Sequence, residues 1–79
     1  MRINTSEEIG GAVRAARKAL GWSQTELAVR VGTTQAVISK FENTGDGLID
    51  TLLRIVEALD LQLLLLQRRN SPLWHEPVD

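Results

Sequence analysis

The segment TTQAVISKFE, residues 33–42, combines two sets of side chains at helical spacing. One set is apolar and would be buried in a folded protein: Val37, Ile38 and Phe41. The other set has no bulky member and would point outward: Gln35, Ala36, Ser39 and Lys40. Glutamine can bond bidentately to adenine, alanine can contact a thymine methyl group, serine can bond to a base or a phosphate, and lysine can bind a phosphate. The outward face therefore predicts recognition of DNA in the major groove.

The residues around this segment predict a helix-turn-helix. The tetrapeptide SQTE, residues 23–26, has the pattern of a capping box and begins a helix that Gly32 ends. The apolar face of this helix comprises Leu27, Ala28 and Val31. Thr34 is the natural N-cap of the next helix, so only a short connection separates the two helices and the chain must turn sharply. Because the second helix of this motif lies in the major groove, its polar face becomes the predicted recognition surface.

The starts of the two helices extend the predicted DNA-binding set. Gln24 lies where free backbone N–H groups can bind a phosphate, and its side chain could hold the same phosphate and fix the register on DNA. Ser23 and Thr34 belong to the set by position, although N-caps stabilise helices whether or not DNA is present. The predicted DNA-binding residues are Ser23, Gln24, Thr34, Gln35, Ala36, Ser39 and Lys40.

Two further helices are predicted, one on each side of the motif. The tetrapeptide TSEE, residues 5–8, is another capping box and begins a helix that Gly21 ends. Its apolar face comprises Ile9, Val13, Ala16 and Leu20. Gly10 and Gly11 are expected to weaken its first turns, by about 1 kcal/mol each relative to alanine. After the loop NTGDG, a last helix begins near Asp50 with a buried stripe of Leu52, Ile55, Val56 and Leu59.

A leucine-rich run, residues 61–67, follows the last helix and has two interpretations. Leucine favours helix, so the helix could continue, but Asp60 interrupts the apolar stripe and the run has strand length. We favour a strand, and since a lone strand leaves its backbone unpaired, we expect it to pair with the strand of a second copy. The predicted dimer interface comprises Leu61, Leu63, Leu64, Leu65 and Leu66. Alternatively, these leucines are ordinary core beneath the last helix and require no dimer.

The composition favours one small cytoplasmic domain without a catalytic site. The chain has 79 residues, of which 43% are hydrophobic, with no cysteine and no apolar run that could span a membrane. Its net charge is −1, but residues 1–42 hold six basic and four acidic side chains, whereas residues 43–79 hold three basic and six acidic ones. The sequence has no phosphate-binding glycine loop, metal-ligand cluster or nucleophile beside a base, so we expect no enzyme activity, cofactor or metal.

Residues 68–79 are expected to form a flexible tail after a folded domain of residues 1–67. Their sequence, RRNSPLWHEPVD, contains two prolines and no apolar periodicity. Trp74 is a large apolar ring in a segment with nothing to pack on, and such side chains are typical anchors of segments that order on binding a partner. Alternatively, Trp74 folds back onto its own domain.

The chain from Arg17 to about Leu63, more than half of its length, resembles the helix-turn-helix domain of Xre and Cro/CI-type repressors. Their pattern G-x-S-Q-x-x-L-A-x-x-x-G, followed by x-x-x-x-x-I-S-x-x-E, matches residues 21–42 as GWSQTELAVRVGTTQAVISKFE. The resemblance implies an all-α, lambda-repressor-like bundle of four to five helices, with a short C-terminal β-strand pairing across a dimer. It also implies that Gln24 holds a backbone phosphate, and that Arg17 and Glu42 form a structural pair between the first and third helices.

Within this family, the segment SKFENTGDG, the helix LLRIVEALDL and the leucine run resemble HipB-type antitoxins. Those proteins are dimeric repressors that bind their own operator and a HipA-type kinase toxin. The resemblance therefore implies a homodimeric, sequence-specific repressor that binds its own operator DNA and a HipA-like kinase. Two alternatives fit the same residues: an orphan or phage-type repressor, and a protein-interaction module that does not bind DNA.

Overall fold

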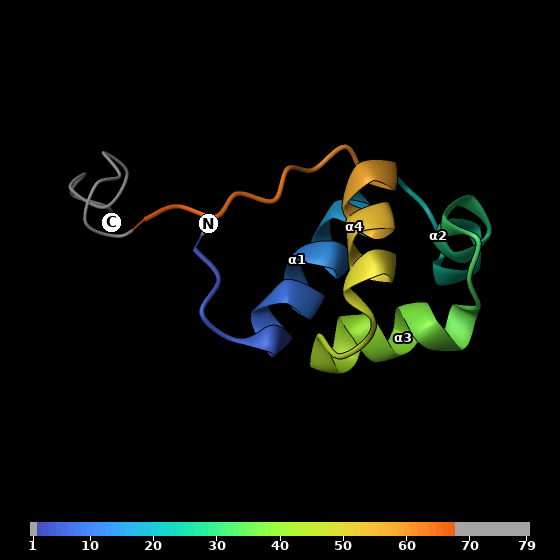
Figure 1. Ribbon diagram of the computed structural model, residues 1–79. Helices are drawn as coiled ribbons and strands as arrows, with labels where there is room; N and C mark the ends of the chain where they lie inside the picture. The colour runs from blue at the N-terminus through green and yellow to red at the C-terminus, as the bar shows by residue number, and fades with distance from the viewer. Residues whose placement is uncertain (1, 68–79) are drawn as a thin grey trace.

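The computed structural model describes residues 2–67, which form four helices and, within that range, no strand (Figure 1). In chain order these are α1 (Ser6–Ala19), α2 (Gln24–Val31), α3 (Gln35–Thr44) and α4 (Ile49–Ala58). The all-α prediction is confirmed for these residues, while the predicted tail of residues 68–79, with Trp74, lies outside them. None of the four helices is long and apolar enough to cross a lipid bilayer.

Helix α1 begins where its sequence predicts, but the end of its predicted apolar face is exposed. Thr5 Oγ1 accepts a hydrogen bond from the Glu8 backbone N–H at 3.2 Å, and the Glu8 carboxylate accepts from the Thr5 N–H at 2.9 Å. Gly21 follows the helix with the predicted left-handed backbone, at a φ of 74°. The prediction for Leu20 is wrong: it is 47% exposed, because the helix ends before it and the turn carries it away from the buried face.

Helices α2 and α3 form the predicted helix-turn-helix. Gly32 ends α2 with a φ of 79°, a left-handed conformation that glycine adopts without steric cost. Thr34 caps α3, since its Oγ1 accepts a hydrogen bond from the Val37 backbone N–H at 3.2 Å. Figure 1 shows the chain turning sharply between the two helices, which places α3 across one side of the bundle.

The helices enclose a core of aliphatic side chains and one phenylalanine. The buried apolar residues are Val13, Leu27, Ala28, Val31, Ile38, Phe41, Leu52, Ile55 and Leu59, and the sequence pattern predicted all of them. Val37 and Val56 pack against this core but are only half-buried. Burial of a large aliphatic side chain contributes about 1.5–3 kcal/mol. The inner face of α3 is therefore firmly anchored, and its polar face must point outward.

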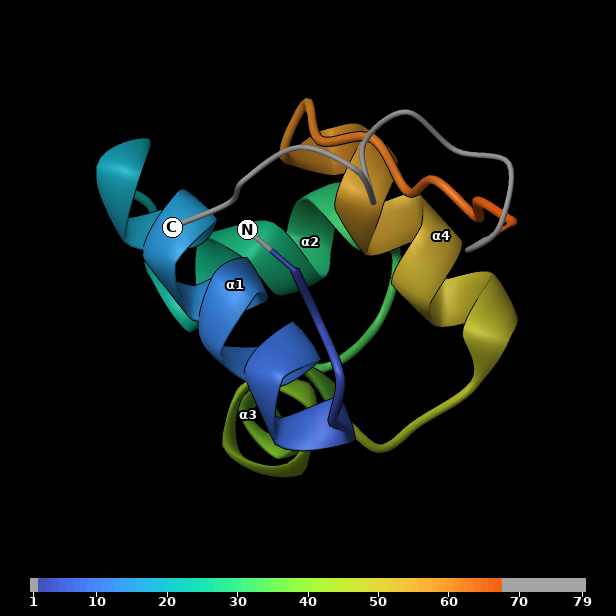
Figure 2. The same ribbon diagram turned by 90° about the vertical axis from the view of Figure 1, so that its left-hand side faces the viewer.

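Two glycines allow α1 to approach the end of α3 closely (Figure 2). A Cβ atom added at Gly10 would overlap the Phe41 carbonyl oxygen and would lie 2.7 Å from the Glu42 carbonyl oxygen. Gly45, which follows α3 with a φ of 72°, lies against the Ser6 backbone in the same way. The interpretation of Gly10 as a weak point of α1 is therefore incomplete, because the missing side chain is what permits the contact between the helices.

The leucine-rich residues 61–67 continue as neither helix nor strand within the described chain. Helix α4 ends at Ala58, and Asp60 has a left-handed φ of 57°, which directs the chain away from the helix axis. The alternative in which the helix continues is therefore wrong. The leucines are exposed, from 40% for Leu61 to 93% for Leu65, so the alternative of a core beneath α4 is also wrong.

Candidate nucleic-acid interface

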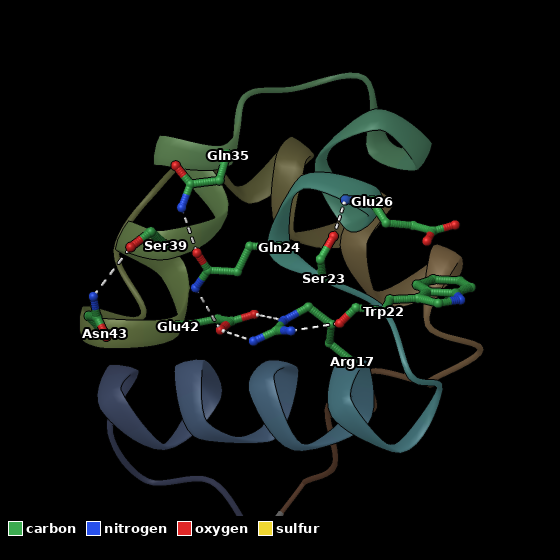
Figure 3. Close-up of polar contacts among 9 residues, drawn as sticks. All are labelled: Arg17, Trp22, Ser23, Gln24, Glu26, Gln35, Ser39, Glu42 and Asn43. Carbon is green, nitrogen blue, oxygen red and sulfur yellow. Dashed lines mark hydrogen bonds and ion pairs between the residues drawn. The ribbon is translucent and has the colours of Figure 1, made fainter.

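The polar face of α3 points away from the core. Gln35, Ala36 and Lys40 are exposed and Ser39 is half-buried. Asn43 extends the same face by one turn, and its Nδ2 donates a hydrogen bond to Ser39 Oγ at 3.4 Å (Figure 3). The assignment of Asn43 to the loop NTGDG is wrong, because α3 continues to Thr44, and helical spacing from Gln35 and Ser39 puts Asn43 on their side of the helix. The face offers amide and hydroxyl groups and one ammonium, without bulky side chains that would hold the backbone away from a groove.

Gln24 and Gln35, both predicted to contact DNA, are hydrogen-bonded to each other. Gln35 Nε2 donates to Gln24 Oε1 at 2.6 Å, which joins the first residue of α3 to the first residue of α2. Gln24 Nε2 in turn donates to Glu42 Oε1 at 3.0 Å. Figure 3 shows the three side chains in a row, leading from the outward face of α3 into the core. The structure thus brings two separately predicted residues into one polar network.

A buried ion pair lies at the inner end of this network. Arg17 Nε donates to Glu42 Oε2 at 2.6 Å, and an Arg17 NH2 hydrogen goes to Glu42 Oε1 at 3.0 Å. The remaining guanidinium nitrogen, NH1, donates to the Trp22 backbone carbonyl at 2.7 Å. The two side chains are only 9% and 1% exposed. The predicted pair between α1 and the end of α3 is confirmed, and its partners leave the carboxylate fully satisfied.

The ion pair fixes the charge state of Glu42. Burial opposes ionisation, but hydrogen bonds from Arg17 and Gln24, with the positive charges of Arg17 and Arg14, outweigh it and hold the pKa of Glu42 below its ordinary value of 4.5. The hydrogen bond to Glu42 outweighs burial for the guanidinium too and raises the pKa of Arg17. Glu42 is therefore ionised at neutral pH, and an ionised carboxylate can only accept hydrogen bonds.

The start of α2 carries a cap and a stacked pair of side chains. Ser23 Oγ accepts a hydrogen bond from the Glu26 backbone N–H at 3.0 Å, so its predicted capping role is confirmed. The Glu26 carboxylate does not complete the predicted capping box, because it pairs with Arg30 at 2.9 Å. The Arg30 guanidinium also lies 4.0 Å from the centroid of the Trp22 ring. Sequence reasoning did not single out Trp22, whose half-buried ring closes the core beside the helix start.

Lys40 is the cation at the centre of the outward face. Its Nζ lies 3.7 Å from Asp46 Oδ2, and both side chains are well exposed. Exposed pairs of this kind contribute only about 0–1 kcal/mol, so Lys40 can exchange Asp46 for a phosphate at little cost. No cluster of His, Asp and Glu side chains that could hold a metal ion occurs among residues 2–67.

The helix pair and its polar outward face define a helix-turn-helix domain, a class of domain found in DNA-binding proteins. Residues 13–66 match the family model described as Helix-turn-helix. The chain belongs to this helix-turn-helix family.

HipB antitoxins are among the members of this family that the chain is similar to. It is 34% identical to antitoxin HipB of Escherichia coli (strain K12) over 71 residues, which cover 89% of this chain and 81% of that protein. Its structure is similar to HipB in a HipA-HipB-O2-O3 complex, with a TM-score of 0.77 and 34% identity over 85% of this chain and 96% of that chain. A HipB-O4 20mer complex gives a TM-score of 0.76, also at 34% identity, with the same coverage of both chains.

Proposed function

We propose that this chain is a DNA-binding repressor and antitoxin of the HipA-HipB type, which binds an operator next to its own gene. The observation that carries the proposal is the outward face of α3, on a helix-turn-helix that is 34% identical to HipB structures solved with operator segments. The second helix of the motif enters the major groove with its N-terminal residues at the base edges. Helix α3 begins at Gln35, so Gln35 and Ala36 are the residues best placed to contact bases.

The remaining polar residues divide between bases and phosphates. Ser39 lies one turn after Gln35 and is suited to either, while Lys40, Asn43 and Gln24 are suited to phosphates because they flank the row of base contacts. Ser23 and Thr34 are the N-caps of α2 and α3, and the free backbone N–H groups at these two helix N-termini can also bind phosphates. The proposed DNA-binding residues are Ser23, Gln24, Thr34, Gln35, Ala36, Ser39, Lys40 and Asn43.

A HipA-like kinase toxin is the second proposed partner. The support is the similarity to a HipB chain that was solved together with HipA and the O2-O3 segments. Since HipA and these segments are present in one complex, we assign the kinase contact to surfaces other than the outward face of α3.

Binding to a DNA fragment from immediately upstream of the gene tests the proposal. Fluorescence anisotropy at two salt concentrations, with unrelated DNA as control, should show tight and selective binding to the upstream fragment. Affinity should fall steeply with salt, with a log-log slope near −0.9 for each neutralised phosphate. Equal or absent binding to both DNAs would contradict the repressor function and favour a protein-interaction module.

Gln35→Ala and Lys40→Ala should affect DNA binding in different ways. Loss of the Gln35 amide removes a base contact, so we expect Gln35→Ala to reduce discrimination at one base pair by about 1–3 kcal/mol. Loss of the Lys40 ammonium removes a phosphate contact, so Lys40→Ala should weaken binding to all sequences alike and flatten the salt dependence. Each variant serves as the control for the other. Unchanged operator binding by both would show that this face of α3 does not recognise DNA.

We extend the proposal to a homodimer in which residues 61–67 of two copies pair as strands within the domain of residues 1–67. The support is the row of exposed leucines, since a soluble monomer seldom exposes such a contiguous apolar segment. Strands pair their backbone groups with a neighbouring strand, and a second copy would supply that neighbour. Two copies of α3 related by the dimer axis would reach successive major grooves about 34 Å apart, which predicts a palindromic operator.

Replacing Leu63 and Leu65 with lysine should convert the dimer into monomers. Both side chains are exposed in the single chain, so the charges would disrupt the pairing without entering the core. Leu48→Lys is the matched control, because Leu48 is also exposed but lies at the start of α4, away from the leucine run. Analytical ultracentrifugation should show monomers for the double variant only. A double variant that sediments as a dimer would contradict the shared-strand arrangement.

A further inference from the structure

The amide groups of Gln24 and Gln35 are each held in one orientation by a neighbour. A glutamine amide can turn either its oxygen or its NH2 group toward a partner, and the partner decides which. The ionised Glu42 carboxylate can only accept, so Gln24 must direct its Nε2 toward Glu42, at 3.0 Å. Gln24 Oε1 then faces Gln35, whose own Nε2 must point inward, at 2.6 Å (Figure 3).

This order of bonds decides which atoms Gln35 presents to DNA. One Nε2 hydrogen of Gln35 is engaged with Gln24, so its outward groups are Oε1 and a single remaining N–H. One acceptor beside one donor matches adenine, whose N6 donates and whose N7 accepts in the major groove. Guanine presents two acceptors, O6 and N7, and matches two donors instead.

We propose that Glu42 is a positioning residue that sets the base preference of Gln35, acting through the amide of Gln24. The inference rests on the proposed DNA-binding function and adds a specificity determinant behind the recognition surface. The Glu42 side chain is 1% exposed, and Arg17 holds both of its oxygens. The orientation of the whole chain of bonds is therefore fixed by the core before DNA binds.

Glu42→Gln should reverse the orientation. We expect the oxygen of the new amide to keep the shorter Arg17 contact, the one from Nε at 2.6 Å, so that its NH2 group takes the place of Oε1, loses the 3.0 Å bond from Arg17 NH2 and faces Gln24. Gln24 must then turn Oε1 toward position 42 and donate from Nε2 to Gln35 Oε1. Gln35 now presents two N–H hydrogens outward. We expect the preference at the contacted base pair to shift from adenine toward guanine by about tenfold.

The experiment begins with wild-type protein selecting duplexes from a randomised double-stranded DNA library. Adenine and guanine are then exchanged at each position of a selected duplex, and binding of wild-type and Glu42→Gln protein is compared by fluorescence anisotropy. Gln24→Ala is a second variant, which breaks the chain of bonds and leaves the ion pair in place. It should reduce the adenine preference, and Glu42→Gln should cause no further change of preference in the Gln24→Ala background.

Two measurements separate the positioning role from a merely structural one. Ile38→Val loosens the packing of α3 without touching the amides, so it should lower stability and leave the base preference unchanged. In DNA-free protein, the NMR signals of the Gln24 and Gln35 side-chain amides should both shift on Glu42→Gln. A shift confined to Gln24 would contradict the transmission of orientation to Gln35.

The outcomes distinguish this inference from the function on which it rests. A wild-type protein that selects no sequence would contradict the proposed DNA-binding function itself. A wild-type preference that persists in Glu42→Gln and in Gln24→Ala, with only a uniform loss of affinity, would overturn the role of Glu42 and leave the proposed function intact. If Glu42→Gln does not fold, the adenine preference of Gln24→Ala is decisive, because Glu42 is proposed to act only through the amide of Gln24. An unchanged adenine preference in Gln24→Ala would overturn the role of Glu42, and a reduced one would support it.

Discussion

Gly10→Ala should lower the free energy of unfolding by about 3 kcal/mol, the upper part of the range for overpacked sites. The added Cβ would overlap the Phe41 carbonyl oxygen, and the Glu42 carbonyl oxygen would lie 2.7 Å from it. Both neighbours are backbone atoms within α3, so no side chain can move aside to relieve the clash. The helices must separate, which would also strain the contact between Arg17 and Glu42. Urea denaturation followed by circular dichroism measures the change.

Gly11→Ala is the matched control. Gly11 lies in the same helix, is exposed, and has nothing within 4 Å of the position of an added Cβ. Alanine has a higher helix propensity than glycine, so the free energy of unfolding of Gly11→Ala should rise by about 1 kcal/mol, whereas that of Gly10→Ala should fall. Similar effects at the two positions would show that helix propensity governs both glycines, and that the approach of α1 to α3 does not depend on Gly10.

Local sequence patterns were sufficient to predict the four helices and the core. The cap at Thr5, the stop at Gly32 and the cap at Thr34 each depend on residues within one turn, so the signal is complete in the sequence itself. The outward direction of the predicted recognition face followed because the apolar residues of α3 occupy the opposite side. The identification of Ile38 and Phe41 as core was confirmed for the same reason.

Features that depend on contacts between distant segments could not be predicted in this way. Gly10 has the same local context as Gly11, and only the position of α3 distinguishes them. The bond between Gln24 and Gln35 likewise depends on how α2 and α3 meet. The pair between Arg17 and Glu42 was anticipated only through resemblance to a family, because 25 positions separate the two residues in the chain.

Arg17→Met should destabilise the protein by about 3–5 kcal/mol at neutral pH, because it leaves the Glu42 carboxylate buried without its cationic partner. The side chains are 9% and 1% exposed, so water cannot replace the lost contacts without opening the core. A loss of this size is a large fraction of the roughly 5–15 kcal/mol that stabilises a typical domain. The double variant Arg17→Met, Glu42→Leu is the control, since removal of both charges should restore much of the lost stability.

The loss caused by Arg17→Met should shrink as the pH falls. In the wild type, the pKa of Glu42 lies below 4.5, so the ion pair contributes its full stability above that value and loses it as the pH falls through the lowered pKa. In Arg17→Met, burial acts without the opposing guanidinium and raises the pKa of Glu42, so protonation removes the unpaired charge at a higher pH. The unfolding free energies of the wild type and of Arg17→Met, measured by urea denaturation across the acidic range, should therefore converge as the pH falls. A difference that widens in acid would show that Glu42 is not the group whose charge Arg17 stabilises.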